Sequence, residues 1–446
     1  MNTRGLAWER GAAAFAALTE LMQSLIVPLS APEATDANRF GPKAANLAAL
    51  GQAGLPTPGG FCLDAEAYRI QLAALGLEHA ARNIDSPEPG KARRAALDMK
   101  LGLLDQPITP AVLEPLLAAR RDLLEAARGE PIVVRSSALV EDRFGSSFAG
   151  QFESYLELES ETDFLTAVRS CWAALWSTRV LRYMATHDAS PVETAMAVLV
   201  QPLVPARVSG GGLSQSANGD MVLNATWGLG SAIAQGEVVP ERIVLTREGK
   251  HHETALGRKY HSVGCKHDGR PLLPRTLFSQ PCLSKAQAVE LGQILRKAET
   301  VMGMPVEIEW ALDDRGFKLL QGRPLHLEPT PVPDEVWLRH PALNGQPAGV
   351  GWGSGRACVV NCECELSRIG PGDILVTKVA GPALSQILQQ VGGVVAELGG
   401  STSHLASLAR ERGIPMVLGV LDATTRIPDG AQVAVDGVAG VVRWMR

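Results

Sequence analysis

One histidine in the sequence stands where it could accept a phosphoryl group. His404 ends the run GGSTSH, which begins at Gly399, and it precedes the helically spaced run LASLARERG. This spacing predicts a helix over 404–413 with the histidine at its start. Neutral imidazole is a nucleophile toward phosphorus, and a phosphoryl group there would face the unpaired N–H groups of the helix N-terminus. The alternative is an ordinary helix cap followed by an exposed histidine.

Two other segments place a cation beside small residues. Lys43 follows Gly41 in a turn that opens the helix of GPKAANLAAL, and Arg135 ends the apolar strand IVV just before two serines. A later loop, residues 145–147, adds a glycine and two more serines. Backbone N–H groups at a helix start, together with an ammonium or a guanidinium, bind phosphate oxygens. Each cation taken alone is equally typical of a solvated surface.

Acidic, amide and guanidinium groups occur together in EIEWALDDRGFKLLQGRP, which predicts two strands around the turn DDRG. Period-two spacing puts Glu307 and Glu309 on one side of the first strand, and Gln321 and Arg323 on one side of the second. The oxygen atoms suit magnesium and the arginine suits phosphate. A solvated sheet face is the alternative, although the strands are unusually apolar for one.

The elements expected to position these groups alternate between helices and strands. Helical spacing covers 64–128, 161–187 and 284–302, and strand patterns lie at 131–158, 194–204 and 221–245. We expect a mixed sheet covered by helices up to residue 330, with the stretch after 204 running into a loop. Five prolines between 327 and 348 predict a linker at 331–348, and residues 349–446 predict a second compact domain. The fold class is therefore α+β.

Composition narrows the function classes. The 446 residues include 42 Lys and Arg against 47 Asp and Glu, a net charge of −5, so there is no basic field for nucleic acid or a membrane surface. The apolar stretch 11–29 is interrupted by Glu20 and Gln23, which favours a packed helix over a signal or membrane span.

The seven cysteines are few, widely spread and odd in number, which predicts reduced thiols and a cytoplasmic protein. Cys358, Cys362 and Cys364 have no histidine at ligand spacing nearby. We therefore expect free thiols there and no zinc site.

Six segments in order resemble one known superfamily. They are GPKAANLAALGQAGLPTPGGFCL, VVRSSALVEDRFGSSFAGQFESYL, AVLVQPLV followed by SG, WGLG, PVEIEWAL with LLQGRPL, and GGSTSH. Together they resemble phosphoenolpyruvate synthase and pyruvate phosphate dikinase, and the related rifampin phosphotransferases. The resemblance implies an ATP-grasp nucleotide-binding domain over 1–330, with an N-terminal helical extension, and a swivelling β/β/α phosphohistidine domain over 349–446.

The resemblance also implies roles for residues of this sequence. It makes the chain an ATP-dependent dikinase-type phosphotransferase, in which a histidine takes the β-phosphoryl group, AMP forms, and the histidine domain carries the group to an acceptor. Magnesium accompanies ATP. The implied site comprises His404 as the phosphorylated residue, Lys43 and Arg135 at the ATP phosphates, the backbone of Gln201, Leu203 and Val204 at the adenine, and Glu309 and Gln321 as magnesium ligands beside Arg323.

Some features depart from this family. The chain ends at Arg446 with no acceptor domain in sight, so we expect an unidentified acceptor held by a partner protein. Asn224 stands before the WGLG segment, where the family often has an acidic residue, and 209–220 lacks the usual apolar strand ending in Asn-Pro. Two other functions stay open: an ATP-grasp ligase that forms ADP, and a nucleotide-binding regulatory subunit without turnover.

Overall fold

The computed structural model describes residues 25–85, 88–141, 152, 154–185, 189–258, 280–325 and 335–445. They divide into two compact units. The first unit holds the described residues up to Glu141 and from Phe152 to Leu203, and the second unit holds those from Val204 onward. Residues 11–24 of the predicted N-terminal helix and the loop at 145–147 lie outside the described residues, and Ile26–Pro28 form a strand instead of the end of that helix.

The first unit contains a five-stranded antiparallel sheet. The strand order is β1 (Ile26–Pro28), β2 (Phe61–Leu63), β5 (Met196–Pro202), β3 (Ile132–Ala138) and β4 (Ser154–Leu158). Strand β3 buries every residue except Arg135, and β5 buries every residue except Pro202. Because both strands are almost entirely buried, the one partly exposed guanidinium, that of Arg135, is an exception.

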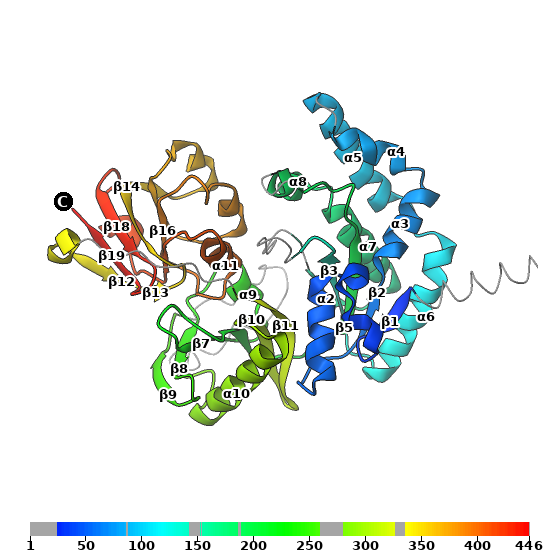
Figure 1. Ribbon diagram of the computed structural model, residues 1–446, viewed down its shortest axis with the longest axis horizontal. Helices are drawn as coiled ribbons and strands as arrows, with labels where there is room; N and C mark the ends of the chain where they lie inside the picture. The colour runs from blue at the N-terminus through cyan, green and yellow to red at the C-terminus, as the bar shows by residue number, and fades with distance from the viewer. Residues whose placement is uncertain are drawn as a thin grey trace, which may run out of the picture. The chain divides into compact units, whose positions relative to one another are not determined.

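Helices cover this sheet and extend away from it (Figure 1). They are α2 (Ala37–Gln52), α3 (Ala65–Ala74), α4 (Glu78–Arg82), α5 (Pro89–Asp105), α6 (Pro110–Ala126), α7 (Glu161–Ala174) and α8 (Thr178–Ala185), with 3-10 turns at Pro32–Thr35 and Asn83–Asp85. The single helix predicted over 161–187 is wrong, since it is divided between α7 and α8. The Ser177 hydroxyl accepts the Val180 N–H and so starts a new helix there. No helix in the described ranges has the length and apolar character needed to span a membrane.

The second unit begins with a six-stranded antiparallel sheet. Its order is β11 (Gly316–Pro324), β10 (Val306–Asp313), β6 (Val208–Leu213), β7 (Met221–Trp227), β8 (Glu241–Leu245) and β9 (His251–Ala255). The helix predicted over 284–302 is confirmed as α10 (Lys285–Met302), which packs on strands β7 to β11 (Figure 1). The predicted hairpin around DDRG is confirmed as β10 and β11.

Strand β6 corrects two expectations. Its sequence VSGGGL was expected to be loop, yet it lies in the middle of the six-stranded sheet. A Cβ on Gly210 would strike the Asn224 carbonyl, so glycine is required for β7 to lie this close. The second correction concerns the sheet itself. The single mixed sheet expected before residue 330 is in fact two antiparallel sheets, one in each unit.

An eight-stranded sheet completes the second unit. Its order is β12 (Ala342–Asn344), β19 (Val441–Trp444), β18 (Gln432–Asp436), β14 (Trp352–Val360), β15 (Ile374–Thr377), β16 (Gly393–Ala396), β17 (Met416–Leu418) and β13 (Gln346–Pro347). The pairs from β14 to β17 are parallel. Short helices join the strands: α9 (Ser231–Ala234) before β8, and in the eight-stranded part α11 (His404–Glu411), α12 (Ala423–Arg426) and 3-10 turns at Glu335–Arg339, Glu363–Arg368 and Pro382–Gln386. Helices and sheets together confirm the α+β class.

Part of the segment expected as a linker forms regular elements. Residues 335–339 form a 3-10 turn, β12 pairs with β19, and β13 pairs with β17. Pro347 occupies the edge strand β13, a position where a missing N–H removes no inner ladder bond. Of the expected linker, 331–334 lie outside the described residues.

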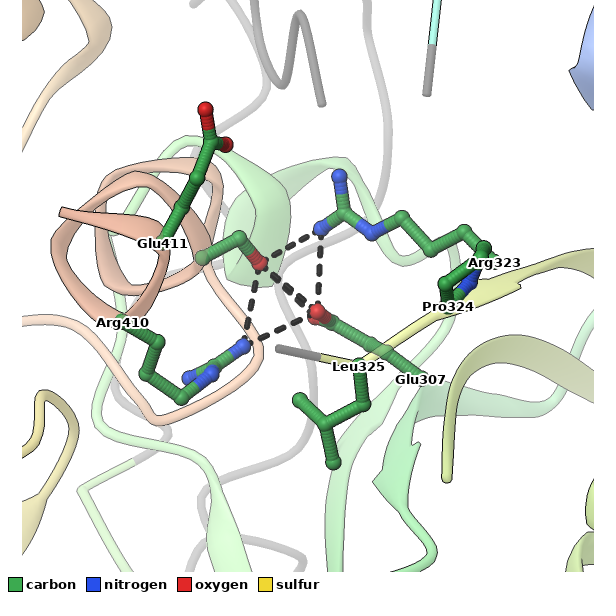
Figure 2. Close-up of a pocket in the computed structure, with 7 residues that line it drawn as sticks. Glu307, Arg323, Pro324, Leu325, Arg410 and Glu411 are labelled. Carbon is green, nitrogen blue, oxygen red and sulfur yellow. Dashed lines mark hydrogen bonds and ion pairs between the residues drawn. The ribbon is translucent and has the colours of Figure 1, made fainter. Parts of the chain in front are cut away.

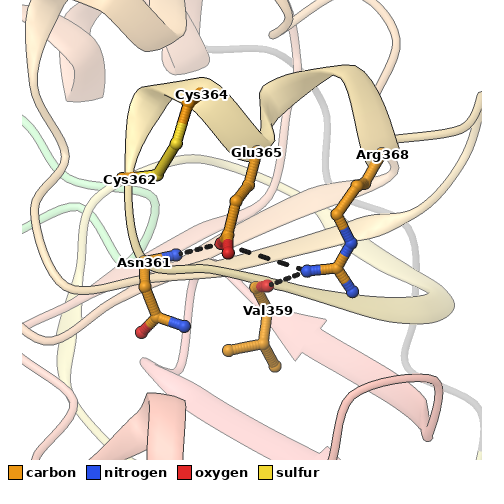
Figure 3. The surroundings of a disulfide bond; sticks show 6 residues. All are labelled: Val359, Asn361, Cys362, Cys364, Glu365 and Arg368. Atoms are coloured by element: carbon orange, nitrogen blue, oxygen red, sulfur yellow. Dashed lines mark hydrogen bonds and ion pairs between the residues drawn. A yellow bond between two sulfur atoms is a disulfide. The ribbon is translucent and has the colours of Figure 1, made fainter.

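Two cysteines expected as free thiols are joined. Cys362 and Cys364 form a disulfide at the start of the 3-10 turn 363–368, with Cα atoms 5.4 Å apart, a separation that a disulfide spans (Figure 3). Cys62, Cys171, Cys282 and Cys358 are free and buried. Burial, together with the nearby Asp64, raises the pKa of Cys62 to about 12. The prediction of unpaired thiols therefore holds for these four and is wrong for the surface pair.

Candidate functional site

Lys43 is fixed against strand β3 in the first unit. Gly41 has a φ of +72° and breaks α2, and a Cβ there would lie 2.5 Å from the Ser137 carbonyl oxygen. The helix that restarts after Gly41 is tied to β3, because Ser137 Oγ accepts the Ala44 N–H at 3.2 Å. Lys43 Nζ donates to the Ser136 carbonyl at 2.8 Å. The predicted lysine thus lies beside the strand that carries Arg135.

Glu141 completes this group. Its Oε1 lies 3.2 Å from Lys43 Nζ, and its side chain is 5% exposed. The sequence reasoning missed Glu141, although an acidic residue six positions after Arg135, where β3 has just ended, is an available signal. Arg135 is partly exposed in the middle of β3, with Leu199 and Ser154 as its neighbours on the flanking strands. The first unit therefore brings both predicted phosphate-binding cations to one strand.

The predicted adenine-facing backbone lies where the first unit ends. Gln201 is buried in β5, and its side chain donates to the Gly59 carbonyl at 3.1 Å. The Leu203 N–H donates to the Pro131 carbonyl, and the Val204 carbonyl accepts the Ala206 N–H. These groups define the path of the chain out of β5, and their role toward adenine stays a prediction.

In the second unit, strand register brings predicted residues into one row. Glu309 of β10 pairs directly with Gln321 of β11 and with Gly211 of β6, and Gly211 pairs in turn with Asn224 of β7. Directly paired residues in antiparallel strands project to the same face. The row Gln321, Glu309, Gly211 and Asn224 therefore lines one face of the six-stranded sheet. The predicted co-facial arrangement in the hairpin follows from this register.

The loop before His404 lies on this row. The hydroxyls of Ser401 and Thr402 donate to Asn224 Oδ1 at 2.7 and 3.1 Å. The three atoms nearest to a Cβ built on Gly211 all belong to Thr402, the closest at 2.5 Å. Gly211 therefore leaves the space in which Thr402 sits. The asparagine that departs from the family pattern has a structural role here, since its side chain holds the histidine loop.

Helix α11, which begins at His404, is held by a buried polar cluster of Glu307, Arg323, Ser407 and Arg410. Figure 2 shows the side chains of Arg323 and Arg410 directed toward Glu307. Arg410 Nη2 lies 2.9 Å from Glu307 Oε2, and Arg323 Nη2 lies 3.1 Å from the same oxygen. Ser407 Oγ donates to Glu307 and accepts from both arginines. A small pocket beside the cluster is lined by Glu307, Arg323, Pro324, Leu325, Ser407, Arg410 and Glu411. The Glu411 carboxylate points away from the cluster (Figure 2).

Two cations outnumber one carboxylate in this cluster. Burial alone would raise the pKa of Glu307, but Arg323, Arg410 and the Ser407 hydrogen bond outweigh it and hold that pKa below its usual value. Burial lowers the pKa of Arg410, and Glu307 opposes this change. Guanidinium stays protonated in proteins, so the cluster carries one net positive charge.

His404 lies between these two attachments. It is the first residue of α11, and the Ser403 hydroxyl accepts the Ala406 N–H as the helix cap. Thr402 on one side sits over Gly211, and Ser407 on the other side contacts Glu307. The second unit therefore brings His404, Glu309, Gln321 and Arg323 to one face of a sheet. Lys43, Arg135, Gln201 and Leu203 belong to the first unit.

The predicted magnesium ligands fit that ion in their chemistry. Glu309 and Gln321 offer a carboxylate and an amide oxygen from directly paired positions. Magnesium in phosphoryl-transfer sites takes one or two protein carboxylates and otherwise phosphate and water. Within the described part of the chain, no three histidine, cysteine or carboxylate side chains gather as a metal site of their own. Glu307, which shares the face with Glu309, forms ion pairs with Arg323 and Arg410.

Sequence reasoning also missed Gly211, Ser407 and Arg410. The polar Ser407 and Arg410 interrupt an otherwise apolar face of LASLAR, and both are buried. A buried arginine in an apolar helix face demands a carboxylate partner, and that signal was available. The partner itself, about a hundred residues away, was not identifiable from spacing.

Comparison with known proteins finds two family domains in this chain. Residues 37–335 match the pyruvate phosphate dikinase AMP/ATP-binding domain, and residues 369–440 match the mobile domain of PEP-utilising enzymes. A probable phosphoenolpyruvate synthase of Methanothermobacter thermautotrophicus is 31% identical over 91% of this chain and 61% of its own length. The phosphoenolpyruvate synthase of Aeropyrum pernix is 31% identical over 90% of this chain and 56% of its own length. The prodigiosin synthesizing transferase PigC of Serratia marcescens is 33% identical over 69% of this chain and 34% of its own length.

The chain belongs to the phosphoenolpyruvate synthase and pyruvate phosphate dikinase superfamily. The resemblance seen in the sequence is thereby confirmed. The chain spans less than two thirds of the length of the curated relatives named here.

Proposed function

We propose that this protein is an ATP-dependent phosphotransferase of the dikinase type, which forms AMP through a phosphohistidine at His404. The observation that carries the proposal is the placement of the His404 segment on the sheet face that bears Glu309, Gln321 and Arg323. We assign an ATP-grasp domain to residues 1–330. We assign the swivelling phosphohistidine domain to residues 349–446; β12, which precedes it, pairs with β19.

The proposed chemistry transfers one phosphoryl group to the protein. A ring nitrogen of neutral His404 attacks the β-phosphorus, the bond between that phosphorus and the bridging oxygen to the α-phosphate breaks, and AMP leaves. The γ-phosphoryl group is still attached to the β-phosphoryl group after this attack, and it then passes to water or inorganic phosphate as the bond between the γ-phosphorus and its bridging oxygen breaks. The β-phosphoryl group stays on His404 until an acceptor attacks it, which restores the imidazole.

Positioning and electrostatics supply most of the catalysis of phosphoryl transfer. In this proposal Lys43, Arg135 and Arg323 hold the phosphate oxygens, and the backbone of Gln201, Leu203 and Val204 contacts the adenine. Glu309 and Gln321 would hold magnesium, which offsets phosphate charge when bound.

The acceptor is not identified by these residues, since an enol, a phenol, an alcohol or another protein would use the same phosphohistidine. A partner protein that holds the acceptor is part of the proposal. Phosphohistidine in water discharges without product, so AMP release by the purified chain should be slow and should rise with partner and acceptor. Native mass measurement after mild purification, with and without cell extract, tests this.

The experiment that tests the function uses magnesium and ATP labelled separately at the β and γ positions. We expect acid-labile, base-stable protein label from the β position only, together with AMP. His404→Ala should lose this label while retaining ATP binding, and the exposed histidine variant His79→Ala should keep it as a matched control. Formation of ADP that survives His404→Ala would favour the ligase alternative. Nucleotide binding without any turnover would favour the regulatory subunit.

A further inference from the structure

We propose that Glu307 is a positioning residue: its buried carboxylate docks helix α11 on the β10–β11 hairpin and so places His404 for phosphorylation. The proposal rests on the proposed function for its catalytic part. Its docking part stands on the contacts of the second unit alone. Glu307 would therefore not be a magnesium ligand, although it shares a strand face with Glu309.

Glu307 receives polar contacts from both parts that it joins. Arg323 approaches its Oε2 from the neighbouring strand β11, and Arg410 and Ser407 approach from α11. The side chains of Glu307 and Arg410 are 6% and 4% exposed. A carboxylate this buried is held in one place, because its charge is stable only with these donors.

Arg410 extends this hold to the histidine loop. Its Nη1 donates to the Ser401 carbonyl and, at 3.0 Å, to the Ala348 carbonyl, while its Nη2 contacts Glu307. One guanidinium thus links the carboxylate on β10 to the backbone three residues before His404. A shift of Glu307, or loss of its charge, should therefore move Arg410 and with it the loop that carries His404.

Charge explains why the carboxylate is needed. Without Glu307 the two guanidinium groups of Arg323 and Arg410 would face each other across Ser407 in a buried site. Like charges in low dielectric repel strongly. The docked position of α11 would then be disfavoured, while β10 and β11 would keep their ladder. Other contacts between the two sheets remain, such as the Gly399 N–H donating to the Val238 carbonyl, so docking should weaken without the unit unfolding.

A steric contact near the other end of the segment offers an independent way to disturb docking. A Cβ on Gly211 meets Thr402 Cβ, Oγ1 and Cγ2, and Gly211 does not require a positive φ. Gly211→Ala should therefore push the loop away while it leaves the strand able to form. Thr402→Gly removes all three atoms, whereas Thr402→Ala keeps the Cβ. The double variant Gly211→Ala with Thr402→Gly and the double variant Gly211→Ala with Thr402→Ala then form a matched pair.

The test compares Glu307→Gln with Asp373→Asn on the full chain. Asp373 binds Arg356 at 2.6 Å within the eight-stranded part, away from α11, and controls for general loss of an ion pair. Amide hydrogen exchange across 405–411 should rise at least tenfold in Glu307→Gln and stay unchanged in Asp373→Asn. Single-turnover labelling of His404 should slow by about 10- to 100-fold, with the dissociation constant for magnesium ATP within about twofold of wild type.

Gly211→Ala should raise the same amide exchange, Thr402→Gly should restore it in the double variant, and Thr402→Ala should not. Unchanged exchange across 405–411 in both Glu307→Gln and Gly211→Ala would overturn the docking proposal. Faster exchange with an unchanged labelling rate would overturn the positioning role. If wild-type protein forms no phosphohistidine at all, the proposed function fails, and the exchange data still decide the docking role.

Discussion

Two buried ion pairs in this molecule use the same chemistry in different ways. In the first unit, Lys43 and Glu141 pair one cation with one carboxylate, and both contact or follow a single strand, β3. In the second unit, Glu307 pairs with both Arg323 and Arg410 and so joins the β10–β11 hairpin to helix α11. The first pair fixes Lys43, the cation proposed to bind phosphate, within one unit. In the second cluster, two buried guanidinium groups share one carboxylate. Loss of that negative charge should therefore weaken the docking of α11 on the β10–β11 hairpin.

The largest effect is expected at the centre of the second cluster. Arg410→Met should lower the free energy of unfolding of the second unit by about 3–5 kcal/mol, because it leaves buried carbonyls and part of a buried carboxylate without their donor. Denaturant unfolding followed by tryptophan fluorescence measures this. A loss below about 1 kcal/mol would mean that the cluster does not hold the unit together.

A smaller effect is expected for the pair in the first unit. Lys43→Met should lower stability by about 1–3 kcal/mol through the lost donor to Ser136 and Glu141, and it should weaken ATP binding at least tenfold. Titration with a fluorescent ATP analogue measures the affinity, with the exposed Lys91→Met as control. Equal affinity of Lys43→Met and Lys91→Met for the ATP analogue would show that Lys43 does not bind the nucleotide.

The pH dependence of docking gives a third difference. The pKa of Glu307 lies below its usual value, so its stabilising effect is complete above the ordinary carboxyl pKa of about 4.3 and disappears as the pH falls through the lower folded-state value. Hydrogen exchange of 405–411, corrected for intrinsic rates, should stay constant between about pH 7 and 5 and increase below about pH 4. Loss of protection already near pH 6 would show that another group controls docking.

The smallest effect is expected at the disulfide. Cys362→Ser opens a very short loop and should change stability by no more than about 2 kcal/mol, with no effect on labelling of His404. Native protein should react slowly with alkylating reagents, because the four free cysteines are buried and burial raises the pKa of Cys62 to about 12. Two rapidly alkylated thiols in untreated protein would show that the surface pair is reduced.

Much of the fold was predictable where local pattern decides it. Helix α10 has a capping box at Ser284 and a left-handed Gly303 at its end, and β10 and β11 pair around their predicted turn with one register shift between Glu309 and Trp310. The glycine-rich strand β6 was not predicted, because its glycines are required by residues distant in the sequence. Asn224 lies against Gly210, and Thr402 lies against Gly211. The partners of Arg410 were missed for the same reason, since Glu307 and the Ala348 and Ser401 carbonyls are brought to it only by tertiary packing.

The most direct test of the central claim is the site and origin of the phosphoryl group. Protein incubated with magnesium and β-labelled ATP, quenched in base and digested, should yield one labelled peptide that contains His404, with a nitrogen-linked phosphate by ³¹P NMR. The same digestion after γ-labelled ATP should yield none. Label on another residue, or label from the γ position, would contradict the account.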